Sequence, residues 1–331
     1  MGRWRVLVTS QSFFEAAPDA ARMLEEAGVD LVRLSVDRPL QDEELACLVG
    51  DVDGIIAGVD RIGRATLQRG VPRLRVIART GVGVDSIDLL TATELGVVVA
   101  NTPGANAESV AELTIGLMVA LARGILEADA NVRAGRWIRR LGRELHGKCL
   151  GIVGFGRIGQ EVARRALAFG MRVAAFDPLV DVDTVEFMGV RLKGFLDVVQ
   201  EADFLTLHVP LLPETHHLIN EAVLRRMKPT AYLVNTARGG VVDEVALAHA
   251  LREGWIAGAA CDVFEEEPPL RSPLLEAPHV LLTPHLGGHT QEAAARMAWT
   301  AANNLLAVLR GERPPHVVNP EVLKRRWHAG Q

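Results

Sequence analysis

Short apolar runs rich in Val, Ile and Leu alternate with segments of helical period along most of the chain. This alternation is typical of strand, crossover helix and parallel strand, and it predicts an α/β protein. Helices are expected at about 15–27, 41–49 and 85–95. The strands expected in this first, small doubly wound unit are Trp4–Thr9, Leu31–Leu34, Gly54–Val59, Leu74–Ala78 and Val97–Ala100.

The proline and glycine of Asn101–Gly104 interrupt this pattern, and a long helix is expected to begin near Asn106. A domain boundary therefore fits at residue 101. Beyond it a second β/α series follows, and its expected strands are 149–153, 171–176, 203–208, 231–235, 257–261 and 280–283.

The last helical pattern, Gln291–Arg310, is followed only by the short segment His316–Pro320. We expect this helix to pack back on the first unit. The prediction is therefore one discontinuous domain, residues 1–101 and 291–331, and one continuous domain, residues 102–290.

Composition narrows the function classes. The 331 residues carry 36 Lys and Arg against 41 Asp and Glu, a net charge of −5, which offers no general attraction to nucleic acid or anionic lipid. The longest apolar run, Leu113–Ala122, is about half the length of a membrane span of about 20 residues. Cys47, Cys149 and Cys261 lack the spacing of a metal site, so we expect buried reduced thiols, no metal and a cytoplasmic location.

A glycine-rich turn follows the strand at 149–153. Its sequence is GFGRIG, and residues 160–168 continue at helical period. Gly154 would allow the tight turn, Gly156 would let the backbone approach a pyrophosphate, and Gly159 would allow close packing of helix on strand. Phosphates would then contact free N–H groups at the positive end of the helix.

The next strand, Met171–Phe176, ends at Asp177. A carboxylate at this place can accept hydrogen bonds from the ribose hydroxyls of a dinucleotide and would repel a 2′-phosphate. No Arg or Lys follows until Arg191. The sequence therefore predicts NAD rather than NADP as cofactor.

Three polar residues follow successive strands of the second series, where the carboxyl ends of an open sheet line the ligand crevice. They are Arg238 in NTARGG, Glu267 in DVFEEEPP and His285 in TPHLGG. Taken singly, each of these residues could be an ordinary polar residue of a surface loop. Together they match hydride transfer from a 2-hydroxy acid: His285 as base, Glu267 to orient its ring and favour its protonated form, and Arg238 to bind a carboxylate in a bidentate fork.

These motifs identify a family. The chain resembles the D-isomer-specific 2-hydroxyacid dehydrogenases, most closely the D-3-phosphoglycerate dehydrogenase branch, over nearly its whole length. The motifs that carry the resemblance, in the family's order and spacing, are Arg79–Asp85, Asn101–Gly104, GFGRIG, Asp177–Pro178, His208–Pro210, NTARGG, DVFEEEP and TPHLGG.

The resemblance implies a Rossmann NAD-binding domain and a flavodoxin-like substrate domain with a cleft between them, and a homodimer built through the cofactor domain. It assigns catalysis to Arg238, Glu267 and His285. It assigns NAD contacts to Gly154, Gly156, Arg157, Ile158, Gly159, Asp177, Val209, Thr236 and Asp262. Substrate contacts would come from Val82 and Gly83 on the carboxylate and from Arg79 on a phosphate, with Arg139 contributed by a partner subunit.

At positions expected near the substrate, the sequence departs from the family's usual pattern. The loop from Ala57 to Arg61 lacks the branch's usual Arg directly after the strand, and His289 replaces a usually small residue. The leading substrate pair is 3-phosphoglycerate and 3-phosphohydroxypyruvate, as in serine biosynthesis. The alternative reactions are the reduction of glyoxylate or hydroxypyruvate, the oxidation of another D-2-hydroxy acid and the oxidation of phosphite. A non-enzymatic alternative is an NAD-sensing binding protein like the family's corepressors.

Overall fold

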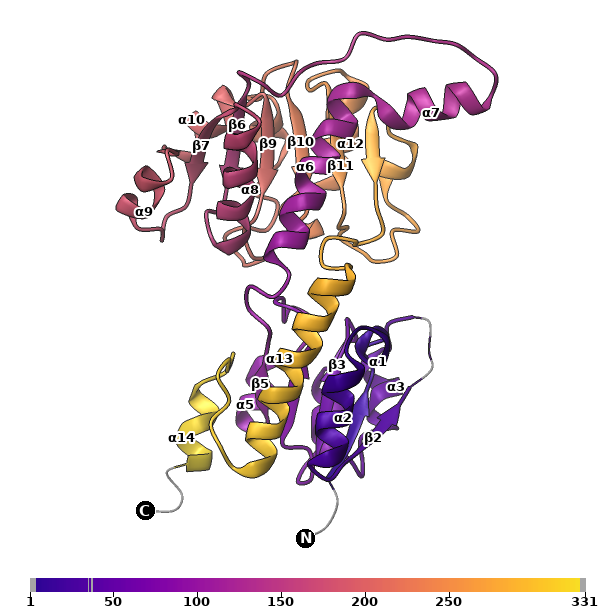
Figure 1. Ribbon diagram of the computed structural model, residues 1–331, viewed down its shortest axis with the longest axis vertical. Helices are drawn as coiled ribbons and strands as arrows, with labels where there is room; N and C mark the ends of the chain where they lie inside the picture. The colour runs from indigo at the N-terminus through magenta and orange to yellow at the C-terminus, as the bar shows by residue number, and fades with distance from the viewer. Residues whose placement is uncertain (1–3, 35, 37, 328–331) are drawn as a thin grey trace. The chain divides into compact units, whose positions relative to one another are not determined.

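The computed structural model describes residues 4–34, 36 and 38–327, and the chain forms two compact units (Figure 1). The first unit holds the described residues up to Asn106 together with those from Gly288 onward, and the second holds Ala107–Gly287. The chain thus leaves the first unit and later returns to it. Residues 102–106 and 288–290, which the sequence pattern assigned to the continuous domain, belong to the first unit.

The first unit is built on a parallel sheet with the strand order β2-β1-β3-β4-β5. This is a doubly wound order, in which the chain moves from the centre of the sheet first to one edge and then to the other. The apolar runs of the sequence form these strands: β1 (Trp4–Val8), β2 (Val29–Arg33), β3 (Gly54–Ala57), β4 (Val76–Arg79) and β5 (Val98–Ala100).

Helices cover this sheet, and the longest of them comes from the end of the chain. Small and apolar residues of this helix, Ala298, Ala301, Ala302 and Leu305 among them, share a core cluster with residues of β1 and β3. After the helix, Val317 forms an antiparallel bridge with Ala100 of β5. The helices are α1 (Phe13–Ala16), α2 (Pro18–Glu26), α3 (Asp42–Ala46), α4 (Arg64–Gly70), α5 (Leu89–Glu94), α13 (Gln291–Arg310) and α14 (Glu321–Trp327).

The second unit contains a parallel sheet with the order β12-β11-β10-β9-β6-β7-β8. The chain starts at β6, winds to one edge through β7 and β8, and returns to build the other half, which is the dinucleotide-binding order. Only the short β8 was not expected. The strands are β6 (Cys149–Val153), β7 (Arg172–Phe176), β8 (Arg191–Leu192), β9 (Phe204–Leu207), β10 (Tyr232–Asn235), β11 (Gly258–Cys261) and β12 (Val280–Leu282).

Both faces of this sheet are buried. Successive residues Leu233 and Val234 of β10 belong to different core clusters, because neighbouring side chains of a strand point to opposite faces. The fold class expected from the sequence, two α/β units with parallel sheets, is confirmed. The covering elements are α6 (Ala107–Arg123), α7 (Ile125–Arg133), α8 (Arg157–Ala168), α9 (Val182–Phe187), α10 (Phe195–Glu201), α11 (Glu221–Leu224), α12 (Glu244–Arg252) and the 3₁₀ turns η1 (Gly239–Val241) and η2 (Pro273–Glu276).

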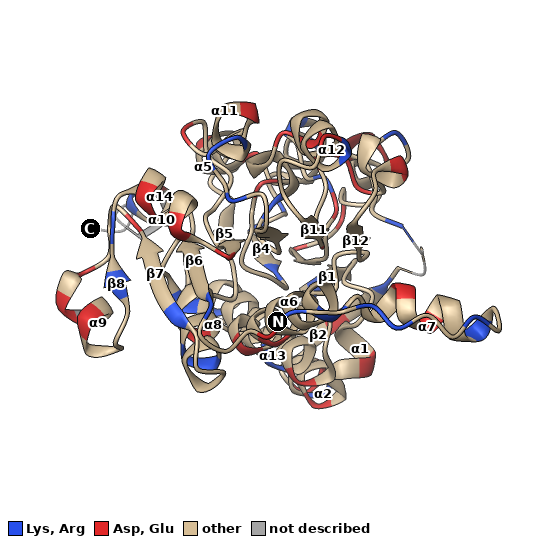
Figure 2. Ribbon diagram, turned by 90° about the horizontal axis from the view of Figure 1, so that it is seen from above, with Lys and Arg blue, Asp and Glu red and all other residues tan. Residues whose placement is uncertain are grey.

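Helix α7 and the segment that follows it form an arm, residues 125–146, which reaches away from the sheet of its unit (Figures 1 and 2). The chain bends by 61° between α6 and α7, and Gly124 at the bend has a φ of +58°. Among the described residues no single helix meets the length and apolarity of a membrane span, although the bent pair α6 and α7 meets them jointly. Large apolar side chains of the arm are exposed, with Trp137 at 81% and Leu141 at 104%.

Two of the three cysteines are buried, as the sequence predicts. Cys149 and Cys261 are buried, but Cys47 is exposed at the end of α3, so the expectation of three buried thiols is wrong there. That helix buries Leu45 and leaves Cys47 on its exposed side, which a sequence pattern of so few residues does not reveal. Within the described ranges, no three His, Cys, Asp or Glu residues lie close enough together to hold a metal ion.

Candidate active site

The glycine-rich turn joins β6 to α8, and its three glycines have different surroundings. Gly154 has a φ of +94°, and a Cβ there would lie 2.7 Å from the carbonyl of His208. A Cβ at Gly159 would lie 2.3 Å from the Gly154 carbonyl oxygen. A Cβ at Gly156 would meet nothing within 4 Å. The protein itself thus requires the first and third glycines, whereas the second leaves open space beside the start of α8.

Asp177, at the end of β7, is bonded to this turn. Its Oδ2 accepts the Phe155 N–H at 2.8 Å and its Oδ1 accepts the Leu179 N–H at 2.8 Å. Each carboxylate oxygen keeps further lone pairs for ligand hydroxyls. Arg157 is exposed and Ile158 half-buried in the first turn of α8, whose backbone N–H groups have no acceptor within the helix. The turn therefore offers N–H donors for phosphates and a carboxylate for a ribose, and it fits NAD.

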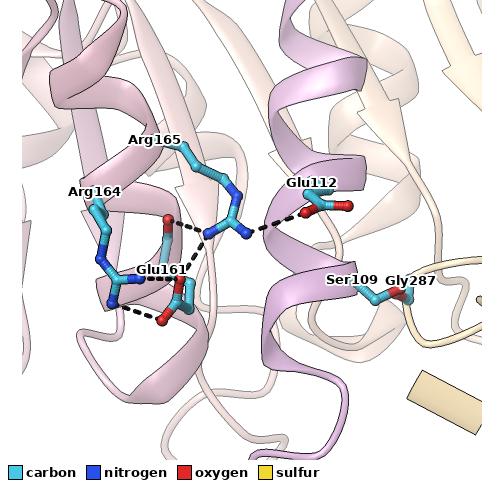
Figure 3. A network of polar contacts seen from close by, with 6 residues as sticks. All are labelled: Ser109, Glu112, Glu161, Arg164, Arg165 and Gly287. Atoms are coloured by element: carbon cyan, nitrogen blue, oxygen red, sulfur yellow. Dashed lines mark hydrogen bonds and ion pairs between the residues drawn. The ribbon is translucent and has the colours of Figure 1, made fainter. Parts of the chain in front are cut away.

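Polar contacts join α8 to α6 and α6 to a distant loop (Figure 3). Arg165 of α8 donates to Glu112 of α6 at 3.2 Å and to Glu161 of its own helix at 2.6 Å. In the first turns of α6, the Ser109 hydroxyl donates to the Gly287 carbonyl at 2.7 Å. Helix α6 therefore contacts both the helix that starts at the glycine turn and the loop that carries His285.

His285 and Glu267 form a hydrogen-bonded pair. The distance from His285 Nδ1 to Glu267 Oε2 is 2.8 Å, and both side chains are partly exposed. Burial alone would raise the pKa of Glu267, but the hydrogen bond and charge of His285, the Phe264 N–H and the charge of Arg238 together hold that pKa below its ordinary value. Glu267 is therefore ionised at neutral pH and able to accept a hydrogen bond from the His285 ring.

Arg238 lies in the loop after β10. Strand β10 pairs with β11, and the loop after β11 carries Glu267. Strands β10, β11 and β12 are neighbours in the sheet, so the loops after them meet at one edge. The Arg238 carbonyl accepts the Asn235 side-chain amide at 2.9 Å, and its Nη1 donates to the Ala237 carbonyl at 2.6 Å. The structure thus brings a guanidinium, a carboxylate and an imidazole together.

Gly239 is a site residue that sequence reasoning missed. A Cβ at this glycine would lie 1.8 Å from the carbonyl carbon of Phe264 and 2.3 Å from the Glu265 backbone nitrogen. The loop with Arg238 and the loop with Glu267 therefore touch backbone to backbone, which only glycine permits. The available signal was the second half of NTARGG, where two glycines follow the arginine.

Asp262 organises the loop that carries His285. It is 1% exposed, and its carboxylate accepts the Thr283 hydroxyl at 2.6 Å and the N–H groups of Leu286 and Gly287 at 2.7 and 2.8 Å. His285 itself has a φ of +55°, which is uncommon for a residue other than glycine. These bonds hold a strained backbone in place, as is frequent at functional sites. The expected contact of Asp262 with a nicotinamide carboxamide stays a prediction.

The other expected cofactor residues lie at the same edge of the sheet. Thr236 is buried, and its hydroxyl is 3.0 Å from that of Thr114 on α6. Val209 is half-buried beside Gly154. Burial lowers the pKa of the neighbouring His208 to about 3, so this imidazole stays neutral and does not compete with His285 for a proton at neutral pH.

The expected substrate residues belong to other segments of the chain. In the first unit, Arg79 Nη1 donates to the Thr80 carbonyl at 2.8 Å, and the guanidinium lies along Gly81. The Val82 carbonyl accepts the Asn101 side-chain amide at 2.7 Å, and Gly83 is half-buried. Arg139 is exposed on the arm of the second unit. The roles of these four residues stay predictions.

Comparison with known proteins decides the family. Residues 115–287 match the family model described as "D-isomer specific 2-hydroxyacid dehydrogenase, NAD binding domain". The chain belongs to this family. Its membership confirms the resemblance seen in the sequence motifs and confirms NAD as the cofactor of an oxidoreductase, in agreement with the glycine turn and Asp177.

Relatives of this 2-hydroxyacid dehydrogenase carry two different names. A protein of Methanocaldococcus jannaschii named D-3-phosphoglycerate dehydrogenase is 46% identical over 91% of this chain, which spans only 57% of that longer protein. A glyoxylate reductase of Korarchaeum cryptofilum is also 46% identical, over 84% of this chain and 86% of its own length. The crystal structure of the TT0316 protein from Thermus thermophilus superposes with a TM-score of 0.85 at 41% identity, covering 95% of this chain and 99% of that one.

Proposed function

We propose that this enzyme transfers a hydride between NAD and C2 of a D-2-hydroxy acid or the corresponding 2-keto acid, with Arg238, Glu267 and His285 as its catalytic residues. The observation that carries the proposal is the 2.8 Å hydrogen bond between His285 and Glu267 at the sheet edge where Arg238 also lies. NAD, when bound, supplies the hydride acceptor.

The three side chains have complementary tasks. Because Nδ1 is bonded to Glu267, Nε2 is the ring nitrogen that takes the hydroxyl proton of the substrate, and the side chain is 41% exposed. Glu267 fixes the ring orientation and compensates the positive charge that the ring gains. The guanidinium of Arg238 binds the substrate carboxylate or the developing carbonyl oxygen. In the reducing direction the same imidazole returns the proton.

We further propose a substrate without phosphate, such as glyoxylate or hydroxypyruvate. In the loop after β3, the apolar Val59 is 53% exposed and the buried Asp60 accepts the Leu40 N–H, so no cation precedes Arg61. The Arg79 guanidinium is bonded within its own loop. 3-Phosphoglycerate is the second candidate, supported by the name of the Methanocaldococcus jannaschii relative.

A comparison of three keto acids tests both parts of this proposal. We expect NADH oxidation with glyoxylate and hydroxypyruvate, and a kcat/KM for 3-phosphohydroxypyruvate less than about 10-fold above that for hydroxypyruvate. A phosphate held by arginine would instead contribute about 1.5–3 kcal/mol, or roughly 10- to 100-fold. A preference of that size would make 3-phosphoglycerate the substrate. No turnover of any D-2-hydroxy acid or keto acid, with NADH bound, would favour an NAD-sensing binding protein.

We propose that the arm pairs two copies of the chain. Its exposed apolar residues include Ile125, Leu126 and Val132 as well as Trp137 and Leu141. Exposed apolar surface of this kind marks interaction sites. A second copy suits it because the arm projects from its own unit (Figure 1), and Arg139 lies on the same arm. The transfer of Arg139 to a partner's site and a cytoplasmic location stay predictions from the sequence.

Sedimentation analysis tests the pairing. We expect the wild-type protein to sediment with the mass of two chains and the W137S/L141S variant with the mass of one. L90S is the matched control, since Leu90 is an apolar residue of α5 that is 80% exposed but lies outside the arm. A dimer that survives in W137S/L141S would show that the arm is not the interface.

A further inference from the structure

Glu244 is a buried carboxylate that belongs neither to the expected cofactor residues nor to the three catalytic residues. It is the first residue of α12 and is 7% exposed. Its Oε1 accepts the Glu265 backbone N–H at 2.7 Å, and its Oε2 accepts the hydroxyl of Ser272. Burial of a carboxylate is costly unless hydrogen bonds satisfy it, so these two contacts account for its place in the fold.

The contact between Glu244 and Glu265 is reciprocal. The Glu265 Oε1 accepts the Glu244 backbone N–H at 3.3 Å, at the helix end where a negative charge is favoured. The same oxygen lies 3.0 Å from the Nε2 of His217. Glu265 is therefore fixed through both its main chain and its side chain.

The residues that Glu244 holds lie on both sides of Glu267. Between Glu265 and Ser272 the chain is largely exposed and has little packing of its own. Within this segment Glu267 has two polar contacts of its own that the structure gives, the Phe264 N–H at 3.2 Å and His285 at 2.8 Å. The position of the Glu267 carboxylate therefore depends on how the two ends of the segment are anchored.

We propose that Glu244 is a positioning residue that acts through Glu267: by holding Glu265 and Ser272, it keeps the Glu267 carboxylate within hydrogen-bond distance of His285. This inference rests on the proposed function. Glu244 takes no part in proton or hydride transfer, and its effect on the reaction passes entirely through the pair of Glu267 and His285.

Three variants test the proposal. E244A removes both acceptors and should lower kcat by roughly 10- to 100-fold, as expected for a catalytic group displaced by about 1 Å, with the Kd for NADH unchanged. E244Q should recover most of the activity, because its amide oxygen can accept the Glu265 N–H while its NH₂ group donates to Ser272 Oγ. E253A, an exposed glutamate at the other end of α12, is the matched control.

An NMR signal of the His285 ring separates positioning from general support of the fold. In the wild type the Nδ1–H proton lies in the hydrogen bond to Glu267, and it should give a downfield signal that H285A lacks. If Glu267 moves away in E244A, this signal should move upfield or be lost. A loss of stability alone would lower Tm and leave the signal of the folded protein in place.

The same signal can be recorded without turnover. Its loss in E244A together with absent turnover in the wild type would overturn the proposed function and support the positioning role. If E244A does not fold, S272A removes one of the two contacts and should change kcat and the signal in the same direction by less. Folded E244A, or S272A in its place, with wild-type kcat and an unchanged signal would overturn the proposal.

Discussion

Replacement of His285 by alanine should lower kcat for keto-acid reduction by about 10²- to 10⁴-fold, the usual contribution of a positioned acid or base. The imidazole is hydrogen-bonded to a carboxylate whose pKa is held low, whereas burial lowers the pKa of His208 to about 3 and keeps that ring neutral. Steady-state kinetics gives kcat, and NADH fluorescence should show an unchanged Kd.

H289A is the comparison for this variant. His289 is an exposed histidine a few residues further along the chain. We expect its removal to change kcat much less than removal of His285. A large loss of kcat in H289A together with wild-type kcat in H285A would show that His289, not His285, is the acid and base.

Replacement of Gly239 by alanine should separate the loops that carry Arg238 and Glu267. The new Cβ would overlap the Phe264 carbonyl, and backbone cannot move aside as a flexible side chain can. Overpacking of this kind costs about 1–3 kcal/mol or more, which corresponds to a fall in Tm of roughly 2–12 °C for a domain of this size. We expect kcat/KM to fall by about 10²-fold, because the two catalytic groups lose their spacing.

The neighbouring glycine supplies the control. A Cβ at Gly240 would meet the ends of the Leu211 side chain at 3.2 and 3.3 Å, and these can shift by a rotamer change. G240A should therefore retain most of the activity and stability of the wild type. Equal losses in G239A and G240A would show that the backbone contact with Phe264 is not what matters in this loop.

Much of the architecture follows from local patterns. The apolar runs became strands because buried parallel strands are apolar on both faces, as Leu233 and Val234 show. The glycine turn was predictable because the positive φ of Gly154 and the close contact of Gly159 are conditions that few other residues meet. Polar residues in the loops that follow buried strands pointed to the sheet edge where Arg238, Glu267 and His285 lie.

Other features depend on contacts between segments distant in sequence. Gly239 has no unusual dihedral requirement, and its need for a missing side chain comes only from the Phe264 backbone. The sequence alone gives Glu244 no special role, because a glutamate is common at the start of a helix. Its hydrogen-bond partners lie 21 and 28 positions away along the chain. In the arm at 125–146 most large apolar residues, such as Trp137 and Leu141, face solvent, and only Leu145 near its end belongs to the core of its own unit, so a pattern of buried positions could not predict the arm.

The return of α13 to the first unit has a consequence for biosynthesis. Ribosomes make proteins from the N-terminus, and domains fold largely as they emerge. The five-stranded layer is translated first, yet Ala301 and Leu305 of its core are translated only after the whole dinucleotide-binding unit. The first unit therefore starts to be translated first but completes its core last. Its five-stranded sheet lacks α13 until the second unit has been translated.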